Sequence, residues 1–84
     1  MKVLVVYAHP CGESFNAAVR DRLVAALGEA GNEVQVADLY AEDFDPVMGA
    51  DERRGYHAPG DNEASVAGEL ERLRWCEALV FVYP

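Results

Sequence analysis

An apolar run and an amphipathic repeat follow each other at the start of the chain. Residues 2–8 (KVLVVYA) are nearly all apolar and rich in β-branched side chains, which is typical of a strand buried on both faces of a parallel sheet. Pro10 ends this strand because proline lacks the N–H that a sheet requires. A helix is predicted next, with Ser14 as its N-cap and Gly31 just beyond its last turn. Its predicted buried stripe consists of Phe15, Val19, Leu23, Ala26 and Ala30.

The second predicted strand has a weaker apolar pattern than the first. In residues 33–39 (EVQVADL), Val34 and Val36 share one face and alternate with other residues, which indicates a strand near a sheet edge. Residues 40–62 show no clear period and contain prolines, glycines and many acidic side chains. We expect this stretch to be a long loop whose carboxylates form a solvated face.

A second helix and a third strand complete the pattern. Apolar residues at steps of three and four predict a helix over about residues 62–76. Its stripe consists of Val66, Leu70 and Leu73. Asp61 or Asn62 is the predicted N-cap. Residues 78–83 (ALVFVY) repeat the character of the first strand, so we expect another strand that is buried on both faces.

This alternation of strands and helices predicts an α/β fold, with a parallel sheet and helices on its faces. In the flavodoxin-like strand order 2-1-3-4-5, the second strand is an edge and the first and third are interior, which agrees with the patterns above. We therefore expect strands 1 to 3 of a doubly wound sheet, in βαβαβ order, with residues 1–84 as the N-terminal half of the domain. The third strand would present an apolar open edge. A swapped or paired half-domain dimer is the alternative.

Composition and charge narrow the classes of partner. The 84 residues carry 7 Lys and Arg against 15 Asp and Glu, a formal net charge of −8. Such a surface argues against nucleic acid or an anionic membrane as the main partner. No apolar run reaches the roughly 18 residues of a membrane helix, so no membrane insertion is expected. Two cysteines, Cys11 and Cys76, are too few for a disulfide framework, which favours a cytoplasmic protein.

The loop between the first strand and the first helix is the candidate site. Ligands of open parallel sheets bind beyond the carboxyl ends of the strands, where residues 9–16 (HPCGESFN) are expected. The loop ends at a helix N-terminus, whose free N–H groups favour an anion. His9, Ser14 and Asn16 add side-chain donors, and the loop contains no Lys or Arg. A phosphate would therefore be held by backbone amides and neutral donors.

Each of these residues also has a purely structural interpretation. Ser14 caps the helix, a role that is compatible with binding a phosphate. The Phe15 side chain is expected in the core, with its N–H free for the phosphate. Cys11 has no visible base partner, so we interpret it as a bystander. Asp38 lies at the end of the second strand, as a ribose-binding acid would, but the first loop has only Gly12 and therefore lacks the dinucleotide-binding G-x-G-x-x-G pattern.

Three blocks of sequence together resemble a known family. They are VVYAHP with ESFNA (residues 5–10 and 13–17), DLYA with FDPV (38–41 and 44–47), and EALVFVYP (77–84). In this order they are similar to the NAD(P)H:quinone oxidoreductase family of flavodoxin-like flavoproteins, and they span nearly the whole chain.

The resemblance implies a flavin, FAD or FMN, and NAD(P)H as electron donor. Carried over by position, the residues that contact the phosphate portion are His9, Ser14, Phe15, Asn16 and Ala17. Pro84 begins the loop that lies along the isoalloxazine ring. The family is typically homodimeric and transfers hydride from NAD(P)H to flavin and then to a quinone. The residues after this proline, including the family's catalytic loop, lie outside the sequence, so no catalytic residue is assigned and the isolated chain is expected not to turn over quinone.

Two alternatives remain open from the sequence. Ala8-His9-Pro10 followed by Glu13 also resembles the zinc-dependent N-deacetylases, which have an AHP motif followed by acidic residues. Here Cys11 and Gly12 stand where two of those acids belong, so His9 and Glu13 are too few for a zinc site and no metal is expected. The second alternative is a non-enzymatic, truncated half-domain.

Overall fold

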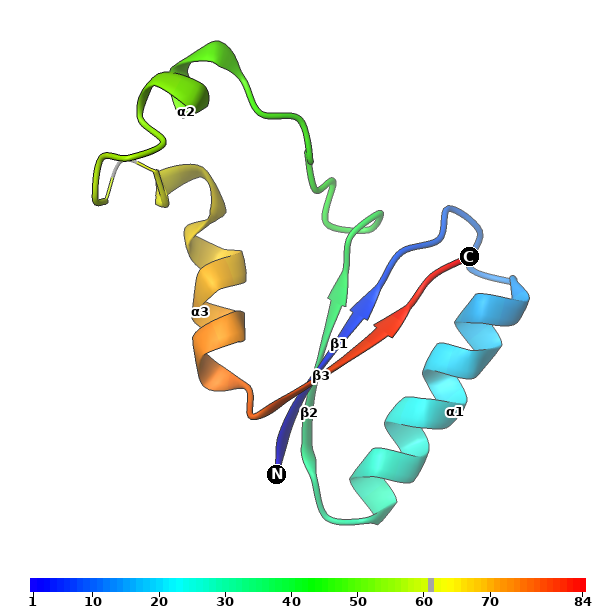
Figure 1. The fold of residues 1–84 in the computed structure, drawn as a ribbon. Coiled ribbons are helices and arrows are strands. Elements are labelled where there is room, and N and C mark those ends of the chain that lie inside the picture. The colour runs from blue at the N-terminus through cyan, green and yellow to red at the C-terminus, as the bar shows by residue number, and fades with distance from the viewer. Residues whose placement is uncertain (61) are drawn as a thin grey trace.

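Three parallel strands form the centre of the computed structural model, which describes residues 1–60 and 62–84 (Figure 1). They are β1 (Lys2–Tyr7), β2 (Glu33–Asp38) and β3 (Ala78–Val82), in the order β2-β1-β3. In the parallel register, Tyr7 at the end of β1 lies between Asp38 on β2 and Val82 on β3. The predicted α/β class and the flavodoxin-like βαβαβ order are confirmed.

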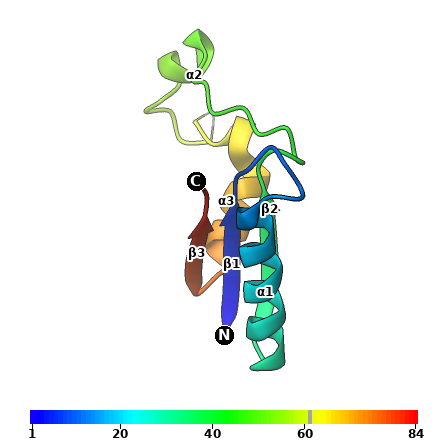
Figure 2. The same ribbon diagram turned by 90° about the vertical axis from the view of Figure 1, so that its right-hand side faces the viewer.

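Helices cover both faces of this sheet. Helix α1 (Phe15–Glu29) lies on one face, and helix α3 (Ala67–Trp75) lies on the other, as the edge-on view in Figure 1 and the rotated view in Figure 2 both show. A single 3-10 turn, η1 (Ala64–Val66), leads into α3. The sheet is thus the middle layer of three, as right-handed crossovers between parallel strands require.

Both ends of α1 form as the sequence predicts. The Ala17 N–H donates to Ser14 Oγ at 3.0 Å, so Ser14 is the N-cap. The helix closes at Ala30, and Gly31 adopts a φ of +88°, a conformation that a residue with a Cβ rarely accepts.

The buried face of α1 differs from the predicted stripe. Only Leu23 of that stripe packs against the sheet core, together with Ala17, Val24 and Leu27. The remaining members of the stripe are exposed: Phe15, Val19, Ala26 and Ala30. Apolar residues lie nearly all round this helix, so periodicity alone did not fix which side faces the sheet.

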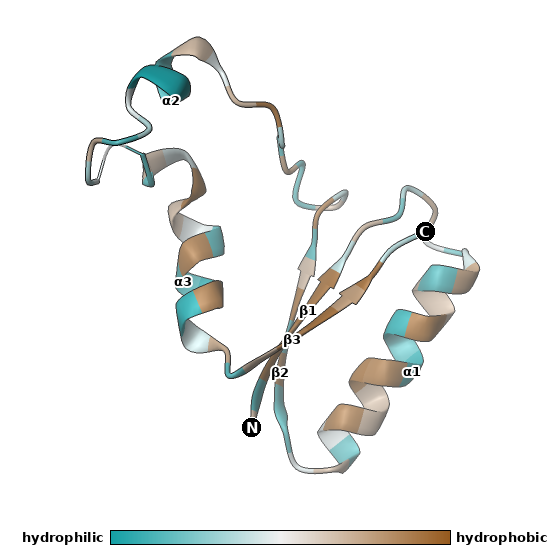
Figure 3. Ribbon diagram, viewed as in Figure 1, coloured by the Kyte–Doolittle hydropathy of each residue, from teal (hydrophilic) through white to brown (hydrophobic). Residues whose placement is uncertain are grey.

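The core lies between β1 and α1. Val3, Val5 and Tyr7 are buried there, and β1 and β3 are largely brown, the hydrophobic colour, in Figure 3. Strand β3 is not buried on both faces as predicted, because Phe81 is 60% exposed and Leu79 is also exposed. Among the described residues β3 is an edge strand, so the predicted apolar open edge is present.

The long segment after β2 is more ordered than predicted. It contains a five-residue helix, α2 (Ala50–Arg54), that has no apolar repeat but has acidic residues in its first turn and arginines in its last. These charges complement the helix dipole. The following helix begins later than predicted, with Val66 as N-cap residue and no side-chain cap. Of the two predicted caps, Asn62 therefore does not cap α3, and Asp61 lies outside the described residues.

Candidate functional site

The carboxyl ends of all three strands meet at one end of the sheet. The loop after β1 (residues 8–14), the turn after β2 (residues 39–46) and Tyr83–Pro84 after β3 all lie at this end, which is the upper end in Figure 1. Open parallel sheets bind ligands here. The residues predicted from the sequence to form the site therefore lie together at the carboxyl end of the strands.

His9 is held in a defined orientation by its own loop. Its Nδ1 accepts a hydrogen bond from the Cys11 backbone N–H at 3.0 Å. A neutral imidazole that accepts at Nδ1 carries its proton at Nε2. His9 therefore presents an N–H donor from a half-buried ring at the end of β1.

The first turn of α1 carries two free backbone donors. Within the described part of the chain, the N–H groups of Phe15 and Asn16 have no hydrogen-bond acceptor, whereas the Ala17 N–H is occupied by Ser14 Oγ. The free groups lie at the positive end of a 15-residue helix. This arrangement favours an anion beside Phe15 and Asn16.

The remaining predicted contacts differ in their exposure. The Phe15 ring is 83% exposed, so the expectation that it lies in the core is wrong, and its side chain is accessible at the site. Ala17 is buried and lies in the core beneath the loop. Pro84 is exposed, two residues beyond β3, whose Val82 carbonyl accepts the Ala8 N–H at 3.0 Å. This bond joins the start of the first loop to the end of β3.

Beneath the loop, Arg20 of α1 connects the helix to both β1 and β2. Its guanidinium carbon lies 4.4 Å from the centre of the Tyr7 ring, a cation–π contact. Arg20 Nη1 also lies 3.5 Å from Asp38 Oδ2 at the end of β2. The sequence did not predict this contact, because the helical pattern indicates only that Arg20 is a polar residue beside an apolar stripe.

The turn after β2 is held by a second arginine from the opposite face of the sheet. Arg72 of α3 makes two hydrogen bonds to the Glu42 carboxylate, at 2.6 and 3.0 Å, and Glu42 also accepts from the Asp38 N–H at 3.0 Å. The hydrogen bond from Arg72 is the main reason that the pKa of Glu42 is lowered, while the same contact raises the pKa of Arg72. Glu42 is exposed, as the predicted solvated face requires, but it also pairs with an arginine thirty residues away, a contact that the sequence pattern did not indicate.

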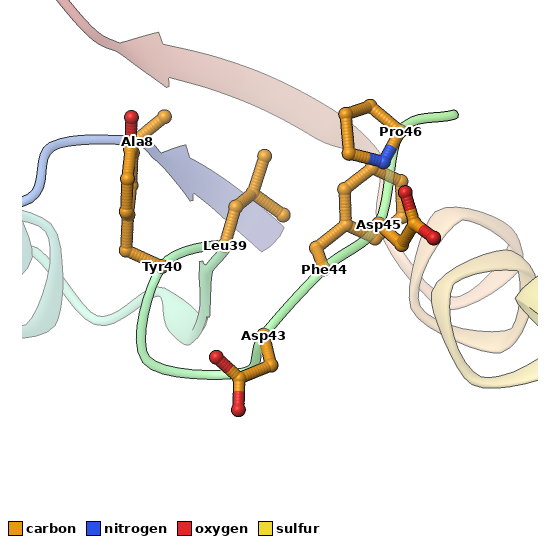
Figure 4. A pocket seen from close by; sticks show the side chains of 7 residues that line it. All are labelled: Ala8, Leu39, Tyr40, Asp43, Phe44, Asp45 and Pro46. Atoms are coloured by element: carbon orange, nitrogen blue, oxygen red, sulfur yellow. The ribbon is translucent and has the colours of Figure 1, made fainter.

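A pocket of about 560 Å³ lies between the first loop and this turn. Figure 4 shows Tyr40 on one side, Phe44 and Pro46 on the other, and Leu39 between them. Ala8, Asp43 and Asp45 complete the lining. Sequence reasoning missed this pocket because its walls lie in a stretch without a hydrophobic period.

Neither a metal-binding cluster nor a membrane-spanning helix occurs among the described residues. Residues 1–60 and 62–84 contain no group of three or more His, Cys, Asp or Glu side chains able to hold a metal ion, so the zinc alternative lacks a ligand set in this part of the chain. No helix in these ranges has the length and apolar character to cross a bilayer.

Comparison with known proteins decides the family. The profile of the family described as having a flavodoxin-like fold matches residues 1–84. The chain belongs to this family. The predicted resemblance to quinone oxidoreductases is confirmed by the relatives and by the solved structures that match this flavodoxin-like chain.

Three of these proteins illustrate the match. A ribosyldihydronicotinamide dehydrogenase-like protein traD from Penicillium crustosum is 34% identical over 100 residues, covering all of this chain and 37% of the relative. NAD(P)H dehydrogenase [quinone] 1 from Rattus norvegicus is 29% identical and covers 99% of this chain and 36% of the relative. The structure of an NAD(P)H:quinone oxidoreductase from Methanothermobacter marburgensis has a TM-score of 0.88 and 31% identity, over all of this chain and 44% of that protein. The chain thus spans about two fifths of the length of these proteins.

Proposed function

We propose that this chain forms the phosphate-binding part of a flavin site in an NAD(P)H-dependent oxidoreductase that reduces quinones. Family membership and the names of the relatives support the reaction class. The observation that carries the assignment of the site is the pair of free N–H groups at Phe15 and Asn16, beside the Nε2 donor of His9.

These donors suit a phosphate in a strongly acidic protein. Backbone N–H groups and the Nε2 donor of His9 can donate to anionic oxygens. The Asn16 side-chain amide adds another donor on the same turn. Ser14 holds the turn in shape by capping Ala17, so we assign Ser14 and Ala17 to positioning the free N–H groups as well as to lining the phosphate.

When bound, a flavin, FAD or FMN, supplies the two-electron chemistry between NAD(P)H and the quinone. This chain's residues hold and orient it. His9, Phe15 and Asn16 fix the phosphate end, and the exposed Phe15 ring offers apolar contact beside it. Pro84 lies at the same end of the sheet, where it would contact the ring system.

We further propose a homodimeric, cytoplasmic protein whose full activity requires more than these 84 residues. The exposed apolar side chains along β3 support a covered edge in the active form, and both cysteines are free thiols. The chain corresponds to 37% of the traD relative, which supports its role as the N-terminal part of a flavin-binding domain that does not reduce quinone alone.

The test compares FMN with riboflavin, which has the same ring system but no phosphate. We expect FMN to bind more tightly to the chain, as measured by quenching of flavin fluorescence. The double variant His9→Ala, Asn16→Ala should lose this preference, because the phosphate loses two donors. The matched control is His57→Ala, Asn62→Ala, which removes the same residue types from exposed positions in the segment between β2 and α3. Equal affinities for FMN and riboflavin, or a preference that survives the double variant, would falsify the proposal.

A further inference from the structure

The pocket beside the first loop is not used by the proposed flavin contacts. Its volume of about 560 Å³ is in the range of small-molecule sites, at roughly 300–1,000 Å³. Its principal walls are the side chains of Tyr40 and Phe44, which lie on opposite sides of Leu39 in Figure 4. Tyr40 is 58% exposed, so a large aromatic surface is available to a ligand.

Backbone hydrogen bonds close the turn that carries these two side chains. The Phe44 N–H donates to the Leu39 carbonyl at 2.9 Å, and the Asp43 N–H donates to the Tyr40 carbonyl at 3.3 Å. The chain reverses at Asp43, which has a φ of +51°, a conformation that aspartate tolerates better than most residues. The turn therefore closes on itself and places Tyr40 and Phe44 on opposite walls.

Contacts to the rest of the fold fix this turn further. The Leu39 N–H donates to the Tyr7 carbonyl at 3.0 Å, which anchors the floor of the pocket to β1. Glu42, between the two rings in sequence, is bound by Arg72 of α3 and by the Asp38 N–H. A pocket with walls that are already ordered loses little conformational entropy when a ligand binds.

The lining also selects the charge of the ligand. Two aromatic rings attract a cation at their faces. Asp43 and Asp45 contribute negative charge to the lining, and no Lys or Arg lines the pocket. From these observations we propose that the pocket between Tyr40 and Phe44 binds a planar aromatic cation, the ring lying between the two walls and the positive charge toward these carboxylates. The pocket does not include the proposed flavin contacts, so the proposal of a cation site can be tested separately from the proposed function.

The test uses three pyridines with one ring system and different charge. The probes are 1-methylnicotinamide, a cation; nicotinamide, which is neutral; and nicotinate, an anion. Each is titrated into the isotope-labelled chain, and the NMR shifts of Ala8, Tyr40 and Phe44 are followed, with Leu27 on α1 as a distant reference. We expect the cation to bind about threefold more tightly than nicotinamide, and nicotinate to bind more weakly than both.

Three variants separate the pocket from non-specific binding. Tyr40→Ala removes one wall and should weaken binding of the cation about fivefold. Tyr56→Ala, which removes another exposed tyrosine, should leave the affinity unchanged. Asp43→Asn retains a side chain that tolerates the positive φ and should lower the preference for the cation over nicotinamide. Far-UV circular dichroism checks that each variant keeps its fold.

Several results would overturn the site. One is the absence of shifts at Ala8, Tyr40 and Phe44 at tens of millimolar of any probe. A second is an affinity order that does not follow charge. A third is an equal effect of Tyr40→Ala and Tyr56→Ala. A fourth is a shift of the pocket signals with protein concentration alone, because a second copy of the chain would then occupy the pocket.

Discussion

Arg72 and Glu42 form a two-bond ion pair, at 2.6 and 3.0 Å, between α3 and the turn after β2. Their side chains are 23% and 35% exposed, so water screens the pair only in part. Glu42 also accepts from the Asp38 N–H, which makes it the one acid of the turn that binds both the helix and the end of the strand. The pair therefore fixes how α3 sits against the edge strand.

Replacing Glu42 tests the contribution of this pair to stability. Glu42→Gln should lower the free energy of unfolding by about 1 kcal/mol, since exposed ion pairs contribute roughly 0–1 kcal/mol and the two-bond geometry is favourable. Urea denaturation followed by circular dichroism measures the change. The control is Glu71→Gln, an exposed acid on the same helix α3. A loss of the same size in the control would show that net charge, not the ion pair, controls stability.

The same pair predicts a dependence of stability on pH. Arg72 lowers the folded-state pKa of Glu42 below the unfolded value, so the carboxylate stabilises the fold at neutral pH. This contribution is fully present above the unfolded pKa of Glu42 and is lost as the pH falls through its folded pKa. Arg72 stays protonated throughout this range because its pKa is raised from an already high value.

The measurement is the difference in unfolding free energy between the protein and Glu42→Gln at a series of pH values. We expect the difference to be largest near pH 7 and to decline toward zero in acid. A difference that stays constant down to low pH would mean that Glu42 has the same pKa in both states.

Much of the fold could be predicted from the sequence, because it depends on local patterns. The first strand has a continuous apolar run, Ser14 and Gly31 mark the ends of α1, and the alternation in β2 marks an edge. These signals lie within a few residues of the feature they specify. The strand order follows from them because parallel connections allow few topologies.

The contacts that shape the site depend instead on distant residues. The face that α1 buries is set by Tyr7 and its neighbours on the sheet, so Phe15 and Val19 remain exposed although they fit a helical stripe. Glu42 meets Arg72 only after the chain has crossed the sheet. The pocket at Tyr40 requires the reversal at Asp43, a conformation that no hydrophobic pattern encodes.

The N-cap of α1 provides a test of local stability near the loop. Ser14→Ala removes the acceptor for the Ala17 N–H and should lower the free energy of unfolding by about 1 kcal/mol. Ser14→Gly should cost only a few tenths of a kcal/mol, because glycine also suits the cap backbone. The control is Ser65→Ala in η1, where the serine makes no cap. Thermal unfolding of all three variants measures the order, and an alanine variant as stable as the unmodified chain would exclude capping by Ser14.

A substitution at Tyr7 is predicted to raise, not lower, the free energy of unfolding. The residue is 1% exposed, and its hydroxyl has no hydrogen-bond partner among residues 1–60 and 62–84. Burying a hydroxyl without a partner costs about 1–3 kcal/mol, whereas the ring itself packs in the core and under Arg20. Tyr7→Phe keeps the ring and the cation–π contact but removes the uncompensated group. The variant should therefore be at least as stable as the unmodified chain, with an increase of up to about 1 kcal/mol in the free energy of unfolding.

Chemical denaturation at pH 7 measures this change, and Tyr83→Phe is the matched control, because Tyr83 is exposed to solvent. A loss of about 1 kcal/mol in Tyr7→Phe alone would mean that the hydroxyl makes a hydrogen bond in solution, to a water or to another chain, and that this bond stabilises the end of β1. A higher free energy of unfolding in Tyr7→Phe would instead show that the buried Tyr7 hydroxyl lowers the stability of the protein. Such a cost is expected where a buried group serves binding and not folding.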